Sequence, residues 1–148
     1  MRVEGEPQRS GRGSAEDMGP HGSGKKRKVV VVRDSLLRGM ERHVSGPDLL
    51  FREMCCLLGA RIQDITDRLP KLIKPADKYP FVLIHVGTND TASNTVARIK
   101  EDYEALGRQL KTLGAQVVFS SILPVTGRGA RRERTILEVN RWLSWWCW

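Results

Sequence analysis

Residues 29–36 read Val-Val-Val-Val-Arg-Asp-Ser-Leu, and the expected fold follows from this short segment. Four β-branched residues in a row favour a strand. Because the run is apolar on both faces, it is typical of a strand in a parallel sheet that helices cover on both sides. Residues 81–86 and 116–122 have the same character, and we also interpret the less regular apolar residues 49–58 as a strand.

Helical patterns separate these expected strands. Apolar residues recur at spacings of three and four within residues 62–74, 96–113 and 136–146, which predicts one amphipathic helix in each range. Gly114 follows the second range in the position typical of a helix C-cap. The alternation of strands and helices predicts an α/β fold, with right-handed crossovers between the strands of a parallel sheet.

The length of 148 residues suits one domain. Residues 1–28 show no apolar periodicity, so we expect a disordered basic leader followed by a single domain over residues 29–148. No apolar run approaches the roughly 20 residues that span a bilayer, and no signal peptide is recognisable, so a cytoplasmic or nuclear protein without membrane contact is expected. The 3 cysteines form no zinc-binding pattern, so no metal is expected.

The net charge of +8 makes acidic partners worth considering. Two basic clusters are candidates for contact with nucleic acid, one at the end of the leader and one in a loop expected before the last helix. Their members are Lys25, Lys26, Arg27 and Lys28, and Arg128, Arg131, Arg132 and Arg134. Such clusters are more often solvated surface than binding sites, so nucleic acid is an alternative rather than the first expectation.

Residues that directly follow the expected strands carry the chemistry. The carboxyl ends of parallel strands meet at one edge of a sheet, so Ser35, Gly59 and Asn89 are expected to converge there. The Ser35 hydroxyl could attack a carbonyl group, while the backbone amides of Ser35 and Gly59 and the Asn89 carboxamide bind the oxyanion that forms. Taken alone, Asp34-Ser35 is more often a turn and helix N-cap than a catalytic site.

Three blocks of sequence resemble a known family. In order and spacing, the blocks Asp34-Ser35-Leu36, Leu58-Gly59-Ala60 and Gly87-Thr88-Asn89-Asp90 resemble the first three motifs of the SGNH (GDSL-like) hydrolases. The likeness covers about residues 29–146, which are also similar to the esterase-like region in the first reading frame of LINE-type retrotransposons. The resemblance implies a flavodoxin-like three-layer α/β/α sandwich that hydrolyses small-molecule carboxylic esters through an acyl-serine intermediate, without metal or cofactor.

The resemblance also assigns roles to residues. Ser35 would be the catalytic nucleophile, Gly59 and Asn89 would share the oxyanion with the Ser35 amide, and Asp34 would hold the nucleophile turn. Arg33 stands where the family has glycine, and it would strain the turn if a positive φ were needed there.

A second departure concerns the catalytic base. The family carries an Asp-x-x-His block after a final strand, but this sequence has no Asp after Asp102 and no His after His85. We interpret His85, within an expected strand, as a hydrogen-bonded core residue, and we give His43 little weight as a substitute base. Loss of the base costs a serine hydrolase roughly 10⁶-fold in turnover.

The expectation is therefore a serine esterase domain that lacks its last strand and has weak or no activity. The alternatives are a catalytically inactive SGNH-like module that binds nucleic acid or derives from a retroelement, and a relic without a folded product. A missing strand would leave the edge at residues 117–122 unpaired beside the 4 tryptophans, which predicts self-association.

Overall fold

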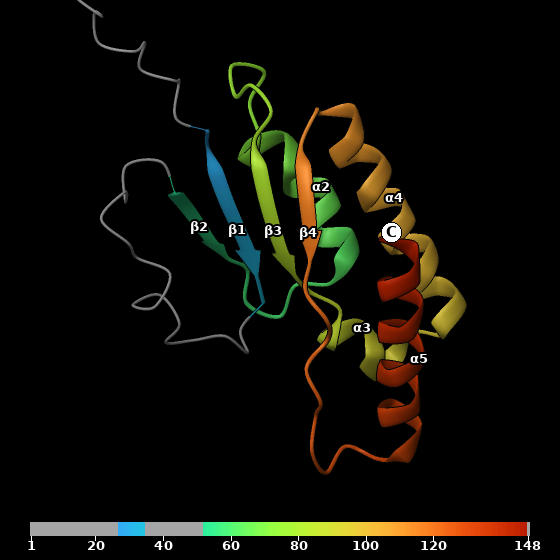
Figure 1. The fold of residues 1–148 in the computed structure, drawn as a ribbon. Coiled ribbons are helices and arrows are strands. Elements are labelled where there is room, and N and C mark those ends of the chain that lie inside the picture. The colour runs from blue at the N-terminus through green and yellow to red at the C-terminus, as the bar shows by residue number, and fades with distance from the viewer. Residues whose placement is uncertain (1–26, 35–51, 148) are drawn as a thin grey trace, which may run out of the picture.

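A parallel sheet forms the centre of the molecule (Figure 1). The computed structural model describes residues 27–34 and 52–147. Its four strands are β1 (Val29–Arg33), β2 (Arg52–Cys56), β3 (Phe81–His85) and β4 (Gln116–Phe119), in the order β2-β1-β3-β4. All neighbouring strands are parallel, as the sequence predicts, and the expected strand within residues 49–58 is confirmed with narrower bounds.

Four helices follow the strands: α2 (Ile62–Leu72), α3 (Thr88–Ser93), α4 (Val96–Thr112) and α5 (Ala130–Trp146). The predicted helices at α2 and α4 are confirmed, and Gly114 has the positive φ of +69° expected just beyond the end of a helix. The last helix begins at Ala130, so the prediction that residues 128–134 form a loop ahead of it is wrong for most of that range. Arginine is a good helix former, which allows the helix to start before its apolar periodicity does.

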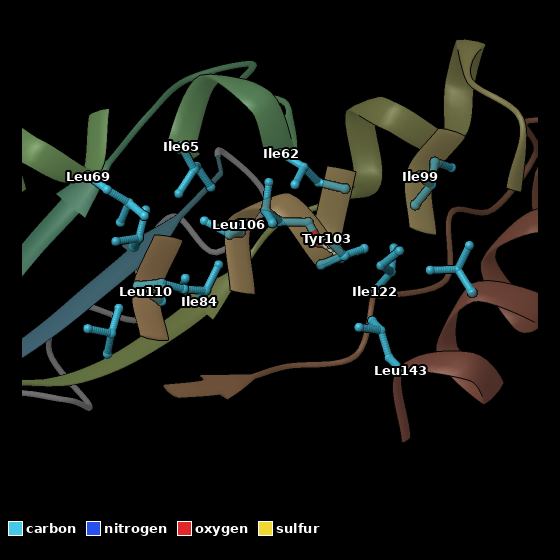
Figure 2. Packing of buried hydrophobic residues seen from close by; sticks show 14 of the residues in the cluster. Ile62, Ile65, Leu69, Ile84, Ile99, Tyr103, Leu106, Leu110, Ile122 and Leu143 are labelled. Atoms are coloured by element: carbon cyan, nitrogen blue, oxygen red, sulfur yellow. Dashed lines mark hydrogen bonds between the residues drawn. The ribbon is translucent and has the colours of Figure 1, made fainter. Parts of the chain in front are cut away.

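The core lies between one face of the sheet and helices α2 and α4. Register places Val30 beside Val82, and Val32 beside Ile84, so these four buried side chains form one apolar surface. Side chains of α2 and α4 pack against it, as Figure 2 shows around Ile84. Helices α2 and α4 thus form a helical layer on the sheet, and the parallel sheet with its helices agrees with the expected α/β fold.

The first described residues are tied to the sheet. Lys28 Nζ lies 3.0 Å from carboxylate oxygens of both Glu53 and Asp77. Arg27 donates to the side chain of Gln116 at 2.8 Å and to the carbonyl of Tyr79. These two cations, expected in a disordered leader, therefore contact the folded chain, while Lys25 and Lys26 lie outside the described residues.

The tryptophans at the end of α5 divide between core and surface. The rings of Trp142 and Trp146 stack with centroids 5.0 Å apart, and Trp146 also contacts Phe119 of β4. Trp145 is 77% exposed, and Val118 on the edge strand β4 is 42% exposed. Self-association through this edge stays a prediction.

None of the helices in the described ranges has both the length and the apolar character needed to span a bilayer.

Candidate functional site

Backbone hydrogen bonds bring three loops together at the carboxyl edge of the sheet. Asp34, directly after β1, donates its N–H to the carbonyl of His85 at 3.2 Å, and Leu57, directly after β2, donates to Arg33 at 3.0 Å. The segments that leave β1, β2 and β3 therefore start side by side. This arrangement follows from the parallel register, which aligns Arg33 with both Cys56 and His85.

The loop that carries Gly59 is in direct contact with Asn89, the second residue of α3. Asn89 Nδ2 donates a hydrogen bond to the carbonyl oxygen of Ala60 at 3.0 Å. Gly59 has a φ of +67°, a conformation that favours glycine, and its N–H makes no hydrogen bond within the described part of the chain. A carboxamide carries two N–H bonds, so Asn89 retains a second donor after its bond to Ala60.

Ser35, the expected nucleophile, lies outside the described residues. The residues that lead to Ser35 are described by the structure as far as Asp34. Arg33 is the last residue of β1, and the one non-glycine residue with a positive φ in the described ranges is Tyr79. The backbone strain considered for Arg33 is therefore not present, because this arginine takes the extended geometry of a strand.

Asp34 and His85 form a buried pair beside this turn. Asp34 is fully buried, and its Oδ1 lies 3.8 Å from His85 Nε2. The other ring nitrogen, His85 Nδ1, lies 2.6 Å from the hydroxyl of Ser120. Burial lowers the pKa of His85, while the Asp34 carboxylate acts in the opposite direction. The interpretation of His85 as a hydrogen-bonded core residue fits this geometry.

Asp90 in α3 also lies at this edge of the sheet, although no role was predicted for it from the sequence. Its carboxylate is fully buried, and Oδ2 accepts a hydrogen bond from the N–H of Ile62, the first residue of α2, at 3.2 Å. Burial raises the pKa of Asp90 to about 6. A carboxylate near a helix N-terminus is favourable, but the helix it serves is distant in sequence, so no local pattern reveals the contact.

Arg132 also reaches this edge of the sheet. It donates to the carbonyl of Thr88 at 2.7 Å and to the hydroxyl of Thr91 at 3.2 Å, both in α3. Its guanidinium is thus engaged within the chain, whereas the other members of the second basic cluster are exposed: Arg128, Arg131 and Arg134. The number of positive charges in the sequence could not show which of these arginines binds within the chain and which are exposed.

A groove of about 560 Å³ runs beside Gly59. Its walls come from the loop after β2 and from one side of α2, and they include Cys56, Leu57, Leu58, Gly59, Ala60, Asp64, Asp67, Arg68 and Lys71. The groove offers space for a small molecule next to the Gly59 N–H, which has no acceptor among residues 27–34 and 52–147.

Neither a protein-family model nor a curated protein matches the chain. Several solved structures match the chain. A protein described as an acylhydrolase, from Bacteroides fragilis, gives a TM-score of 0.67 at 18% identity, with 86% of this chain and 66% of that chain covered. A protein described as lipolytic and of the G-D-S-L family, from Desulfitobacterium hafniense, gives 0.63 at 20% identity, with 82% and 72% covered.

The esterase domain of the ZfL2-1 ORF1 protein, from a zebrafish retrotransposon, is 29% identical over 81% of this chain and 71% of that chain. Its TM-score is 0.39. The Bacteroides fragilis and Desulfitobacterium hafniense structures, with TM-scores above 0.6, superpose over most of this chain. The chain has the fold of the SGNH (GDSL-like) hydrolases.

Proposed function

We propose that this chain is an SGNH-type serine esterase domain that acts on carboxylic esters. The observation that carries the proposal is the 3.0 Å hydrogen bond from Asn89 Nδ2 to Ala60. It holds a side-chain donor next to the residue that follows Gly59, where an oxyanion hole needs two donors directed at one oxygen. The likeness in fold to acylhydrolases and lipolytic proteins supports the same class of reaction.

In the proposed reaction, Ser35 Oγ attacks the ester carbonyl and releases its proton to water. The N–H groups of Gly59 and Ser35 and the second N–H of Asn89 stabilise the oxyanion. The C–O bond to the alcohol breaks, the alcohol leaves with a proton, and water then hydrolyses the acyl-serine. Fixed donors of this kind contribute on the order of 10²- to 10³-fold each to turnover.

We propose that turnover by the chain is slow. Within the described ranges His85 is the one histidine, and its Nδ1 is engaged with Ser120 in the core. A serine without a nearby base is a weak nucleophile at neutral pH. The oxyanion donors alone support roughly 10³- to 10⁴-fold acceleration over water.

Hydrolysis of p-nitrophenyl acetate and intact-mass detection of a fluorophosphonate adduct test this function. We expect one adduct, on Ser35, and loss of both adduct and hydrolysis in Ser35→Ala. Ser93→Ala, which removes an exposed hydroxyl at the end of α3, is the control and should keep both activities. Hydrolysis that is unchanged in Ser35→Ala contradicts the assignment.

We propose a second candidate function, a catalytically inactive module that binds nucleic acid. It is favoured by the exposure of Arg128, Arg131 and Arg134, two of them in the first turns of α5, where positive charge opposes the helix dipole. Binding of a single-stranded RNA should weaken steeply with salt, and replacing the three arginines by glutamine should reduce that salt dependence. No binding at low salt removes this candidate.

A further inference from the structure

Two consecutive residues of α3 hold the segment that follows Gly59. Asn89 donates to the carbonyl of Ala60 at 3.0 Å, and Asp90 accepts from the N–H of Ile62 at 3.2 Å. One contact uses a donor and the other an acceptor, so the chain between Gly59 and α2 is bound on both sides of Arg61.

We propose that Asp90 is a positioning residue of this site, whose carboxylate, by binding the N–H of Ile62, fixes the Gly59 amide relative to the Asn89 carboxamide. The consequence for hydrolysis rests on the proposed function, whereas the geometric coupling between Asp90 and Gly59 does not. Asp90 itself touches no reacting atom in this proposal.

Asp90 caps the N–H of the first residue of α2, but capping alone does not require a buried carboxylate. The N-terminus of α2 already has an exposed carboxylate, Asp64, which accepts from the N–H of Arg61 at 2.8 Å. Asp90 is fully buried instead, and its Oδ1 has no hydrogen-bond partner among the described residues. Burying a carboxylate with one unsatisfied oxygen costs free energy. In exchange for this cost, the Asp90 contact connects α3 to the first residue of α2.

Three variants of the full chain separate positioning from stability. Asp90→Ala removes the acceptor, and Asp90→Asn keeps an oxygen at the same place. Asp77→Ala is the matched control, because Asp77 also accepts from a backbone N–H, that of Lys74 at 2.9 Å, but in the loop that enters β3 from the other edge of the sheet. The readouts are kcat and KM for p-nitrophenyl acetate and the amide NMR resonances of Gly59 and Ile62.

We expect kcat to fall on the order of 100-fold in Asp90→Ala with KM unchanged, because small displacements of catalytic groups have effects of this size. Asp90→Asn should recover most of the loss, and the Gly59 resonance should move in Asp90→Ala but not in Asp77→Ala. An unmoved Gly59 resonance in Asp90→Ala overturns the proposal. An equal loss of kcat in Asp77→Ala does so too.

Failure of the proposed function is distinguishable from failure of this inference. If the unmodified chain shows no Ser35-dependent hydrolysis, the esterase assignment fails, and the Gly59 resonance still decides the positioning role. If Asp90→Ala does not fold, a pH titration of the unmodified chain replaces it. The Gly59 resonance should then follow the ionisation of Asp90 and lose that step in Asp90→Asn; absence of the step overturns the inference.

The charged groups that act on Asp90 in this titration are Asp102 of α4, which raises its pKa, and Arg61 before α2, which lowers it. Asp102 is itself paired with Arg98 at 3.2 Å. Because Asp90→Asn leaves both neighbours in place, a step that disappears in this variant belongs to Asp90.

Discussion

The hydroxyl of Tyr103 donates a hydrogen bond to the carbonyl of Val86 at 2.6 Å, and it also fills the space beside Gly87. A Cβ atom built on Gly87 would lie 2.6 Å from the Tyr103 oxygen and 2.8 Å from Cδ1 of Ile122. Helix α4 thereby braces the turn from β3 into α3, the helix that carries Asn89. Burial raises the pKa of Tyr103, which favours the protonated hydroxyl that donates to Val86.

Gly87→Ala should be the most damaging glycine substitution near the site. Gly87 has a φ of +116°, which strains any side chain, and the new Cβ would overlap both neighbours. We expect a loss of at least about 2 kcal/mol in the free energy of unfolding, measured by urea denaturation. The matched control is Gly59→Ala, where φ is +67° and no atom of the described residues lies within 4 Å of the added Cβ.

For Gly59→Ala we expect only the backbone cost, about 1 kcal/mol. Equal losses in the two variants would mean that the contact with Tyr103 does not constrain Gly87.

Arg132→Met should destabilise the fold by about 1–2 kcal/mol, because it removes hydrogen bonds from a guanidinium to Thr88 and Thr91 while keeping an apolar stem. Its exposed neighbour Arg131 provides the control, and Arg131→Met should change stability by less than about 0.5 kcal/mol. Thermal or urea unfolding of both variants measures the difference. Indistinguishable stabilities would show that the anchoring of α3 by Arg132 contributes nothing in solution.

Asp90 should make stability depend on pH in a recognisable direction. Burial raises its pKa from 3.8 to about 6, so the folded chain binds a proton more tightly than the unfolded chain. The stabilising contribution of this protonation is complete below about pH 4 and is lost as pH rises through about 6. Asp90→Asn lacks this loss, so relative to the unmodified chain it should gain on the order of 2 kcal/mol between pH 4 and pH 7.

Urea unfolding of both proteins at several pH values checks this prediction. Because all other titrating groups are common to the two chains, their difference isolates Asp90. A difference that stays constant with pH, or that changes in the opposite direction, would contradict the raised pKa.

The sheet and the long helices could be predicted because their apolar periodicity reports burial directly. The four-valine run became β1, buried as expected from its lack of a polar face. Helix α3 was not predicted, because it has only six residues and most of them are polar. Tertiary contacts stabilise it instead. Arg132 donates hydrogen bonds to it, and Tyr103 packs against the turn before it. Such contacts join segments that are distant in sequence, so no local pattern encodes them.

The candidate site, too, could be predicted from the sequence only in part. The approach of the Gly59 and Asn89 loops followed from parallel topology, which needs only the order of strands. The buried carboxylate of Asp90 could not be inferred, because burial depends on how α2, α3 and α4 pack. Lys28 was interpreted as part of a basic run at the end of a disordered leader. Its ion pairs with Glu53 and Asp77 could not be predicted from that run.

The most direct test of the account is a crystal structure of the chain after reaction with a fluorophosphonate. We predict phosphorus bonded to Ser35 Oγ, with one phosphonyl oxygen at about 3 Å from both the Gly59 nitrogen and Asn89 Nδ2, the distance at which oxyanion donors act. An adduct whose oxygens point away from these two nitrogens, or a Ser35 that gains no adduct at all, would contradict it.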